Sequence, residues 1–283
     1  MGTTQRIIPG VTGEPNWGNL NIAITAIANT IEKEQDVGEE AEKAVEKEKE
    51  KPSDANKKAV KNINALQNKL YARRSNHFKS ALQNLIRTGG GRGKITKGKS
   101  ASLGKAGLRT ATKFSGFVAG VHSVGLAKAL NNIGFGSLKG KKIQEVIDFL
   151  LVFFADTSSG MDEVAANMAS CEILQMLTVD IKSVEDFEKK LQSLVEDNSL
   201  TEVLCNFYGI YLFEPLSQRF QEKITQIKGE AVSAETFKII KEDILGQLRV
   251  LKTNKELLKI DWKGKEGKDL EEKIFNSIIQ IFE

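Results

Sequence analysis

The feature that most constrains this chain is the spacing of its apolar residues, which recur every three or four positions along much of its 283 residues. Leu20, Ile24, Ile27 and Ile31 show this pattern first, and it is the pattern of a helix with one buried side. Leu20, Ile22 and Ile24 alone would also alternate like a strand, but the helical spacing covers more residues. No hairpin signal and no alternation of strands with helices follows. The sequence therefore predicts an all-α fold, a multi-helix bundle.

The helical pattern continues in segments that turn residues separate. We expect helices over residues 54–87, 108–132, 139–155, 161–178 and 198–227, one that begins after Ser183, and two more around 237–251 and 270–281. Pro215 lies inside the segment 198–227, and it should break or kink that helix because proline has no amide hydrogen to donate.

Composition divides the chain further. Residues 1–19 hold four Gly and two Pro without a helical period, which predicts a mobile N-terminal tail. Residues 20–88 form a helical N-terminal region, within which the highly charged segment 32–51 is expected to be a solvated helix or linker. Residues 89–105 are rich in Gly and Lys and predict a flexible basic linker. Residues 106–283 then form a helical domain.

Within that linker, the stretch Gly93–Ser100 matches the phosphate-loop pattern G-x-x-x-x-G-K-[ST]. A phosphate loop functions only between a buried strand and a helix, where successive backbone N–H groups face the phosphates. The residues before Gly93 have a helical pattern instead, and a Gly-, Lys- and Ser-rich stretch matches by chance easily. The favoured interpretation is a linker without nucleotide hydrolysis.

Charge is unevenly distributed, although the formal net charge is only +4. Between Ala55 and Gln144 there are 19 Lys or Arg and no Asp or Glu, whereas the rest of the chain carries 22 basic and 37 acidic residues. A cationic block of this size attracts phosphates or an acidic protein surface. No known nucleic-acid-binding motif is recognisable. A basic helical adaptor that binds nucleic acid therefore stays an alternative function.

Candidate catalytic residues are few. His77 and His122 are the only histidines, and each lies in an apolar helical setting that favours a structural role. Cys171 and Cys205 lie in apolar segments without a C-x-x-C partner, which is typical of buried thiols and not of a disulfide or a zinc site. We therefore predict that the protein is not an enzyme and that it holds no metal and no cofactor.

No apolar run approaches the roughly 20 residues that cross a bilayer, and the first residues lack the apolar core of a signal peptide. The start Met-Gly is shared with myristoylated proteins, but that motif requires Ser or Thr at position six, where this chain has Arg6. We expect a protein of the cytoplasm without a lipid anchor.

One segment, from about Gly104 to Ser170, carries a resemblance to a known family. Its cues are Gly116–Phe117, the GLAKAL stretch from Gly125, Ile133-Gly134-Phe135, Leu138-Lys139-Gly140, and the helix start Met161-Asp162-Glu163. In these positions the chain resembles QatB, the helical component of Qat anti-phage defence operons. The cues are apolar and glycine positions rather than chemically reactive groups.

The resemblance implies partners. QatB-type proteins are encoded beside an ATPase, a QueC-like enzyme and a TatD-like nuclease, and the QueC-like (QatC-type) enzyme is thought to join a 7-deazaguanine carboxylate to the N-terminal glycine. In this chain that glycine is Gly2, and Thr3, Thr4, Gln5 and Arg6 would be the residues of the tail that bind the partner. An α-amine has an ordinary pKa near 8, so that part of it is unprotonated and nucleophilic at neutral pH. From the residues alone, the favoured interpretation of Gly2 is a small residue tolerated after Met1, and the resemblance reverses this preference in favour of the modified glycine.

Overall fold

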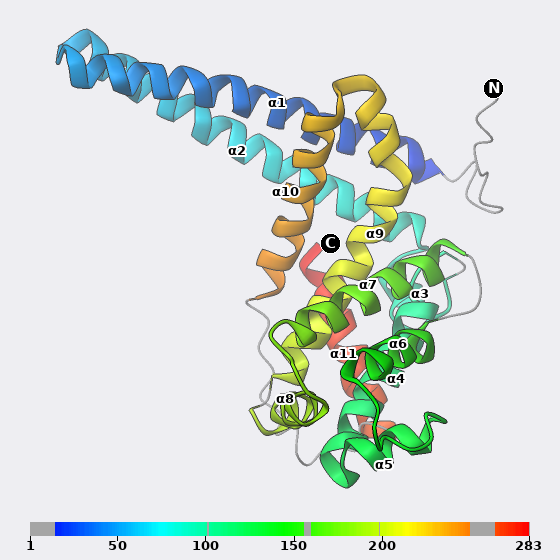
Figure 1. The fold of residues 1–283 in the computed structure, drawn as a ribbon. Coiled ribbons are helices and arrows are strands. Elements are labelled where there is room, and N and C mark those ends of the chain that lie inside the picture. The colour runs from blue at the N-terminus through cyan, green and yellow to red at the C-terminus, as the bar shows by residue number, and fades with distance from the viewer. Residues whose placement is uncertain (1–14, 101, 156–159, 198, 250–263, 283) are drawn as a thin grey trace, which may run out of the picture. The chain divides into compact units, whose positions relative to one another are not determined.

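The computed structural model describes residues 15–100, 102–155, 160–197, 199–249 and 264–282. Within these residues the chain forms helices and no strand, which confirms the all-α prediction (Figure 1). None of the helices in this part of the chain is long and apolar enough to cross a membrane. The helices are α1 (Pro15–Glu50), α2 (Asp54–Thr88), α3 (Arg92–Ile95), α4 (Lys105–Val124), α5 (Leu126–Asn132), α6 (Ile143–Phe154), α7 (Met161–Thr178), α8 (Val184–Glu196), α9 (Leu200–Lys228), α10 (Glu230–Leu248) and α11 (Lys265–Phe282).

The first helix begins earlier than the sequence pattern indicates. α1 starts at Pro15, and Trp17 is buried, although both belong to the tail predicted for residues 1–19. Proline is favourable at the first position of a helix, because its fixed φ suits the helix and the first N–H has no helical partner. The predicted tail is therefore too long at its C-terminal end.

Pro215 does not interrupt α9. The helix runs from Leu200 to Lys228 with the proline inside it, so that of the predicted break or kink the break is wrong. The neighbouring side chains of Tyr211, Leu212 and Leu216 are buried, and their packing offsets the lost backbone hydrogen bond.

Gly125 divides the segment 108–132, which was predicted as one helix, into α4 and α5. Its φ of 81° lies in the left-handed region that favours glycine, so α4 ends there. The next helix, α6, begins at Ile143 and not at Lys139, because residues 133–142 form a turn-rich loop.

The chain divides into two compact units. The first consists of Gly89–Pro215 and Lys241–Phe282, and the second of Gly13–Thr88 and Leu216–Ile240. The second unit thus includes a segment of the region 106–283 that the sequence-based division treats as one helical domain. α9 and α10 each contribute residues to both units.

Aromatic residues of α9 and α11 form part of the core of the first unit. The rings of Tyr208 and Phe275 are stacked with their centroids 4.4 Å apart, and Tyr211 meets Phe275 edge-on at 6.0 Å. All three side chains are buried. Aromatic pairs in these arrangements contribute about 0.5–1.5 kcal/mol beyond their buried area.

In the second unit α1 and α2 lie side by side as an antiparallel pair (Figure 1). The predicted apolar side of α1, Leu20, Ile24, Ile27 and Ile31, is fully buried. Trp17 contacts Phe220 of α9, with ring centroids 6.1 Å apart.

The segment 89–105 differs from the flexible linker that its composition predicts. It contains the short helix α3, and the side chains of Ile95 and Leu103 are buried. Gly104 has a φ of 108°, and a Cβ at this position would lie 2.2 Å from the carbonyl oxygen of Ile95. The glycine therefore permits two backbone segments to approach closely, a tertiary contact that composition does not reveal.

Candidate functional site

The residues that the family resemblance singles out, Gly2, Thr3, Thr4, Gln5 and Arg6, lie outside the described residues. Their role stays a prediction. A different candidate site, a pocket lined by lysines, lies within the first unit.

A lysine-lined pocket of about 630 Å³ lies where α6 and α8 begin. On one side it is lined by the loop before α6 and the first residue of that helix, and on the other by the residues that lead into α8. We call it the lysine pocket, and its lining residues are Leu138, Lys139, Gly140, Lys141, Lys142, Ile143, Lys182, Ser183, Val184 and Glu185.

The loop in front of α6 depends on glycine. Gly140 has a φ of 75°, and the N–H of Lys141 donates to the carbonyl of Leu138 at 3.1 Å. This turn places three lysines within four positions just before the helix. A residue with a Cβ would strain the turn, because L side chains rarely adopt a positive φ.

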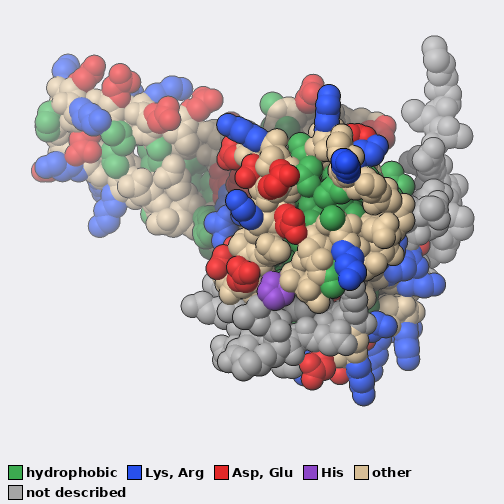
Figure 2. Space-filling view, turned by 60° about the horizontal axis from the view of Figure 1, so that its bottom comes forward, with side chains coloured by type: hydrophobic (Ala, Val, Ile, Leu, Met, Phe, Trp, Pro, Cys, Tyr) green, Lys and Arg blue, Asp and Glu red, His purple; other side chains and the backbone are tan. Residues whose placement is uncertain are grey.

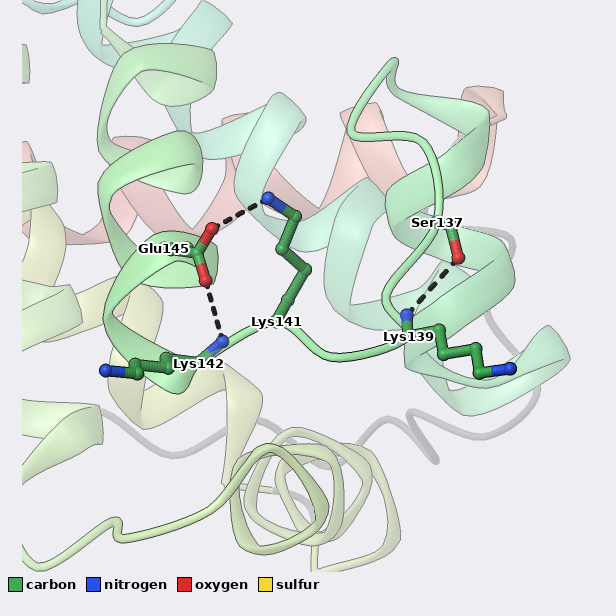
Figure 3. Close-up of polar contacts among 5 residues, drawn as sticks. All are labelled: Ser137, Lys139, Lys141, Lys142 and Glu145. Atoms are coloured by element: carbon green, nitrogen blue, oxygen red, sulfur yellow. Dashed lines mark hydrogen bonds and ion pairs between the residues drawn. The ribbon is translucent and has the colours of Figure 1, made fainter.

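Glu145, in the first turn of α6, holds the start of the helix (Figure 3). Its carboxylate accepts a hydrogen bond from the Nζ of Lys141 at 2.7 Å and another from the backbone N–H of Lys142 at 2.9 Å. The hydrogen bond from Lys141 is the main reason that the pKa of Glu145 is lowered. Figure 3 also shows the side chains of Lys139 and Lys142 extending away from this carboxylate.

The second wall of the lysine pocket is the capped start of α8. The hydroxyl of Ser183 accepts a hydrogen bond from the N–H of Asp186 at 3.0 Å and donates to the Asp186 carboxylate at 2.7 Å. This confirms the helix start that the spacing of Ser183 and Asp186 predicts.

The lysine pocket carries more positive charge than its neighbours neutralise. Among the described residues, no ion pair involves Lys139, Lys142 or Lys182, and Lys141 alone is paired, with Glu145. The lining contains four Lys and a single acidic residue, Glu185. Such a site can bind anions. Its lining contains no histidine, and the hydroxyl of Ser183 is engaged in capping α8. The run of Lys139, Lys141 and Lys142 was visible in the sequence, whereas the addition of Lys182 required the fold.

The basic block 55–144 is divided between the two units. Eight of its 19 basic residues lie on α2, which pairs with α1, and the second half of α1 is rich in acidic residues. Arg74 of α2 forms a partly buried ion pair with Glu34 of α1. Figure 2 shows a face on which acidic and basic side chains are interspersed around a group of hydrophobic ones. Part of the block is thus balanced by acidic residues of the chain itself.

The phosphate-loop match, Gly93–Ser100, has another structure. A helix, α2, precedes it where a phosphate loop needs a strand, and residues 92–95 form α3. The Ser100 hydroxyl accepts hydrogen bonds from the N–H groups of Ser102 at 3.2 Å and Leu103 at 3.3 Å. The hydroxyl that would meet a metal in a phosphate loop therefore holds a local turn.

Asp162 connects the starts of two helices. It lies in the first turn of α7, as expected, but its carboxylate accepts hydrogen bonds from the N–H groups of Gly104 at 3.1 Å and Ala106 at 2.8 Å, at the start of α4. The hydroxyl of Tyr211 also donates to it. Burial, followed by the charge of Asp162, raises the pKa of Tyr211 well above its ordinary value. These contacts use both carboxylate oxygens, which indicates a structural role.

Glu271 of α11 is a second buried carboxylate. It accepts hydrogen bonds from the hydroxyls of Ser115 and Thr112 on α4. Loss of solvation raises its pKa from 4.5 to about 7, and the two hydroxyl donors oppose this increase. The group therefore titrates near neutral pH inside the protein core.

The histidines and cysteines form no shared site. His77 on α2 and His122 on α4 are both half-buried and belong to different units. Cys205 is buried, as predicted, and desolvation raises its pKa to about 12, which makes it unreactive at neutral pH. Cys171 is half-exposed, so that its predicted burial is only partial. No group of His, Cys, Asp and Glu in the described part of the chain could hold a metal ion.

α6 presents apolar side chains to solvent. Val146, Leu150 and Phe154 are buried, but Val152 is 75% exposed and Phe149 and Phe153 are half-buried. Beside Phe153 lies a smaller pocket of about 190 Å³, lined by Thr112, Lys113, Gly116, Phe117, Gly120, Ala129, Asn132, Ile133 and Phe153. Exposed apolar surface next to a cavity is typical of protein-binding sites.

Comparison with known proteins identifies a family that this chain matches. The model of a protein family described as "Qat anti-phage system associated protein QatB" matches residues 95–282. This range includes the lysine pocket, the apolar surface of α6 and both buried carboxylates. No curated protein and no solved structure matches the chain.

Proposed function

The chain belongs to the QatB family of the Qat anti-phage system, and from this membership we propose that it is a non-enzymatic defence subunit that a QueC-like partner enzyme modifies at Gly2. The protein is thus a component of an anti-phage system, and the modification is the specific role that we assign to it. The observation that carries the proposal is the coincidence of family membership with a Met-Gly start.

The proposed chemistry needs only the α-amine of this chain. After removal of Met1, the nitrogen of Gly2 attacks the carbonyl carbon of a 7-deazaguanine carboxylate that the partner has activated as an adenylate. An amide bond forms, AMP leaves with the bonding electrons, and the nitrogen loses its proton to a base or to water. Glycine suits this role because it has no Cβ to obstruct the approach.

The partner is proposed to bind Thr3, Thr4, Gln5 and Arg6 together with the surface of the helical body. The exposed apolar residues of α6 support such a contact, since interface cores are depleted in charge and rich in aromatic residues. The operon ATPase and the TatD-like nuclease are further candidate partners, and we place the assembly in the cytoplasm.

Intact-mass spectrometry after co-expression with the QueC-like enzyme tests the proposal. We expect loss of Met1 and the gain of one deazaguanine-type adduct that maps to the N-terminal peptide. Gly2→Glu should abolish the adduct, because a large second residue keeps Met1 in place and leaves no free glycine amine. Gly2→Ala is the matched control, since it still permits removal of Met1 and shows whether glycine itself is required.

Two results would contradict the proposal. One is an unmodified Gly2 in the presence of active enzyme, ATP and deazaguanine precursor. The other is the same adduct on the Gly2→Glu protein. An enzyme with an inactivated ATP site should give no adduct in any variant.

A further inference from the structure

We propose that the lysine pocket is a binding site for a ligand that carries several phosphate groups close together. The inference concerns a surface of the helical body, and it is independent of the proposed modification of Gly2.

Three lysines of the pocket carry positive charge that no ion pair compensates among the described residues. Lys139, Lys142 and Lys182 line one pocket, and no ion pair in the described part of the chain involves them. Lys141 adds a fourth ammonium group, which Glu145 neutralises. The side chains are exposed, and Figure 3 shows those of Lys139 and Lys142 extending in opposite directions, so that a bound polyanion would draw these mobile ammonium groups together over the pocket.

The size and lining of the pocket indicate the class of ligand. Its volume of about 630 Å³ lies in the range of small-molecule sites. The lining includes Leu138, Ile143 and Val184 but no aromatic side chain, so that no ring is present on which a base could stack. The pocket is therefore suited to the phosphates of a ligand and not to its base.

The backbone adds to this preference. α6 and α8, of 12 and 13 residues, both begin at the pocket, and the N-terminal end of a helix carries partial positive charge. Glu145 and Ser183 satisfy part of the N–H groups there, so the lysines are the principal groups of the site.

Adjacent phosphates occur in free polyphosphates and nucleotides and also in the backbone of nucleic acid. The chemistry is the same in both, and the experiment separates them by its choice of probes. Tripolyphosphate and ATP represent the free compounds, a single-stranded DNA 12-mer represents the backbone, and a peptide of Glu residues represents an acidic protein.

Binding of these probes to the full chain is measured by isothermal titration calorimetry. The pocket variant is Lys139→Gln/Lys142→Gln/Lys182→Gln, and the matched control is Lys128→Gln/Lys189→Gln/Lys190→Gln, which removes the same charge from exposed lysines of α5 and α8 outside the pocket. We expect at least one phosphate probe to bind, with affinity at least about tenfold lower in the pocket variant and nearly unchanged in the control. If the DNA is the ligand, the slope of the logarithm of its affinity against the logarithm of the salt concentration should be less steep by about 2 in the pocket variant.

Each outcome has a defined meaning. Binding of tripolyphosphate and ATP without DNA assigns the site to free phosphate compounds, and binding of DNA alone assigns it to the nucleic-acid backbone. The inference is overturned if no phosphate probe binds, if the control loses as much affinity as the pocket variant, or if the Glu peptide binds as well as the phosphates. Circular dichroism checks that both variants stay folded.

Discussion

At the scale of single residues, two buried carboxylates connect distant segments of the first unit. Asp162 satisfies N–H groups at the start of α4, and Glu271 satisfies hydroxyl groups further along the same helix. A buried charge is costly unless hydrogen bonds compensate it. Burial dominates at Glu271, because its pKa is raised despite two hydroxyl donors.

The raised pKa of Glu271 predicts a pH dependence of stability. Its ordinary pKa is 4.5 and its value in the folded protein is about 7, so the folded state binds the proton more tightly. The resulting stabilisation is complete below about pH 4.5 and is lost as the pH rises through 7. Between these values the contribution to the free energy of unfolding should fall by up to about 1.4 kcal/mol per pH unit.

Urea denaturation of the wild type and of Glu271→Gln at pH 5 and pH 8 measures this effect. Between pH 5 and pH 8 the free energy of unfolding of the wild type should fall relative to that of Glu271→Gln, because glutamine has no proton to lose. Glu272→Gln is the control, since Glu272 is exposed and should keep the dependence of the wild type. An identical pH dependence in the wild type and in Glu271→Gln would contradict the assignment.

At the scale of elements, α6 has more apolar residues than its packing uses. Its sequence, IQEVIDFLLVFF, has polar residues only at Gln144, Glu145 and Asp148, yet only three of its nine apolar residues are buried. The surplus apolar surface supports the proposal that α6 contacts a partner.

A substitution on this surface should separate binding from stability. Val152→Glu should change the free energy of unfolding by no more than about 0.5 kcal/mol, because the side chain is 75% exposed. It should nevertheless weaken binding to the QueC-like enzyme, since a charge would be desolvated in the contact. Val179→Glu is the matched control, because Val179 is also exposed but follows α7. Equal affinity of Val152→Glu and the wild type in calorimetry would remove α6 from the interface.

At the scale of the whole molecule, the two units share helices rather than a linker. The division falls after Pro215 in α9 and after Ile240 in α10. In the second unit Phe220 of α9 is buried and contacts Trp17 of α1, and Glu32 of α1 forms an ion pair with Lys228 of α9 at 2.7 Å. The N-terminal helices are therefore part of the packing of a segment more than 100 residues further along the chain.

Removal of residues 1–88 should for this reason destabilise what remains. In the fragment 89–283, Phe220 loses its contact with Trp17, and the unit that contains the buried residues Phe220, Ile224, Phe237 and Ile240 loses α1 and α2. We expect a lower melting temperature, increased binding of a hydrophobic dye and a tendency to aggregate. Circular dichroism and light scattering of the fragment beside the full chain measure this. A monomeric fragment that melts at the temperature of the full chain would show that the N-terminal helices are dispensable.

Local spacing was sufficient to predict the helical class, the bounds of α7 and the capped start of α8. These features depend on contacts between residues three or four positions apart. The buried side of α1 followed from the same spacing. The family resemblance also rested on short stretches, and it was confirmed over residues 95–282.

Only the tertiary structure decided the features that depend on distant residues. Pro215 remains inside α9 because packing outweighs the local preference of proline, and the linker 89–105 is folded because Ile95 and Leu103 are buried. The lysine pocket forms because the fold places Lys182 beside Lys139 and Lys142. The nearby carboxylates of Glu145 and Glu185 lie in the first turns of two separate helices, α6 and α8. Sequence determines the propensity of each segment locally, whereas burial and charge clustering depend on which segments the fold brings together.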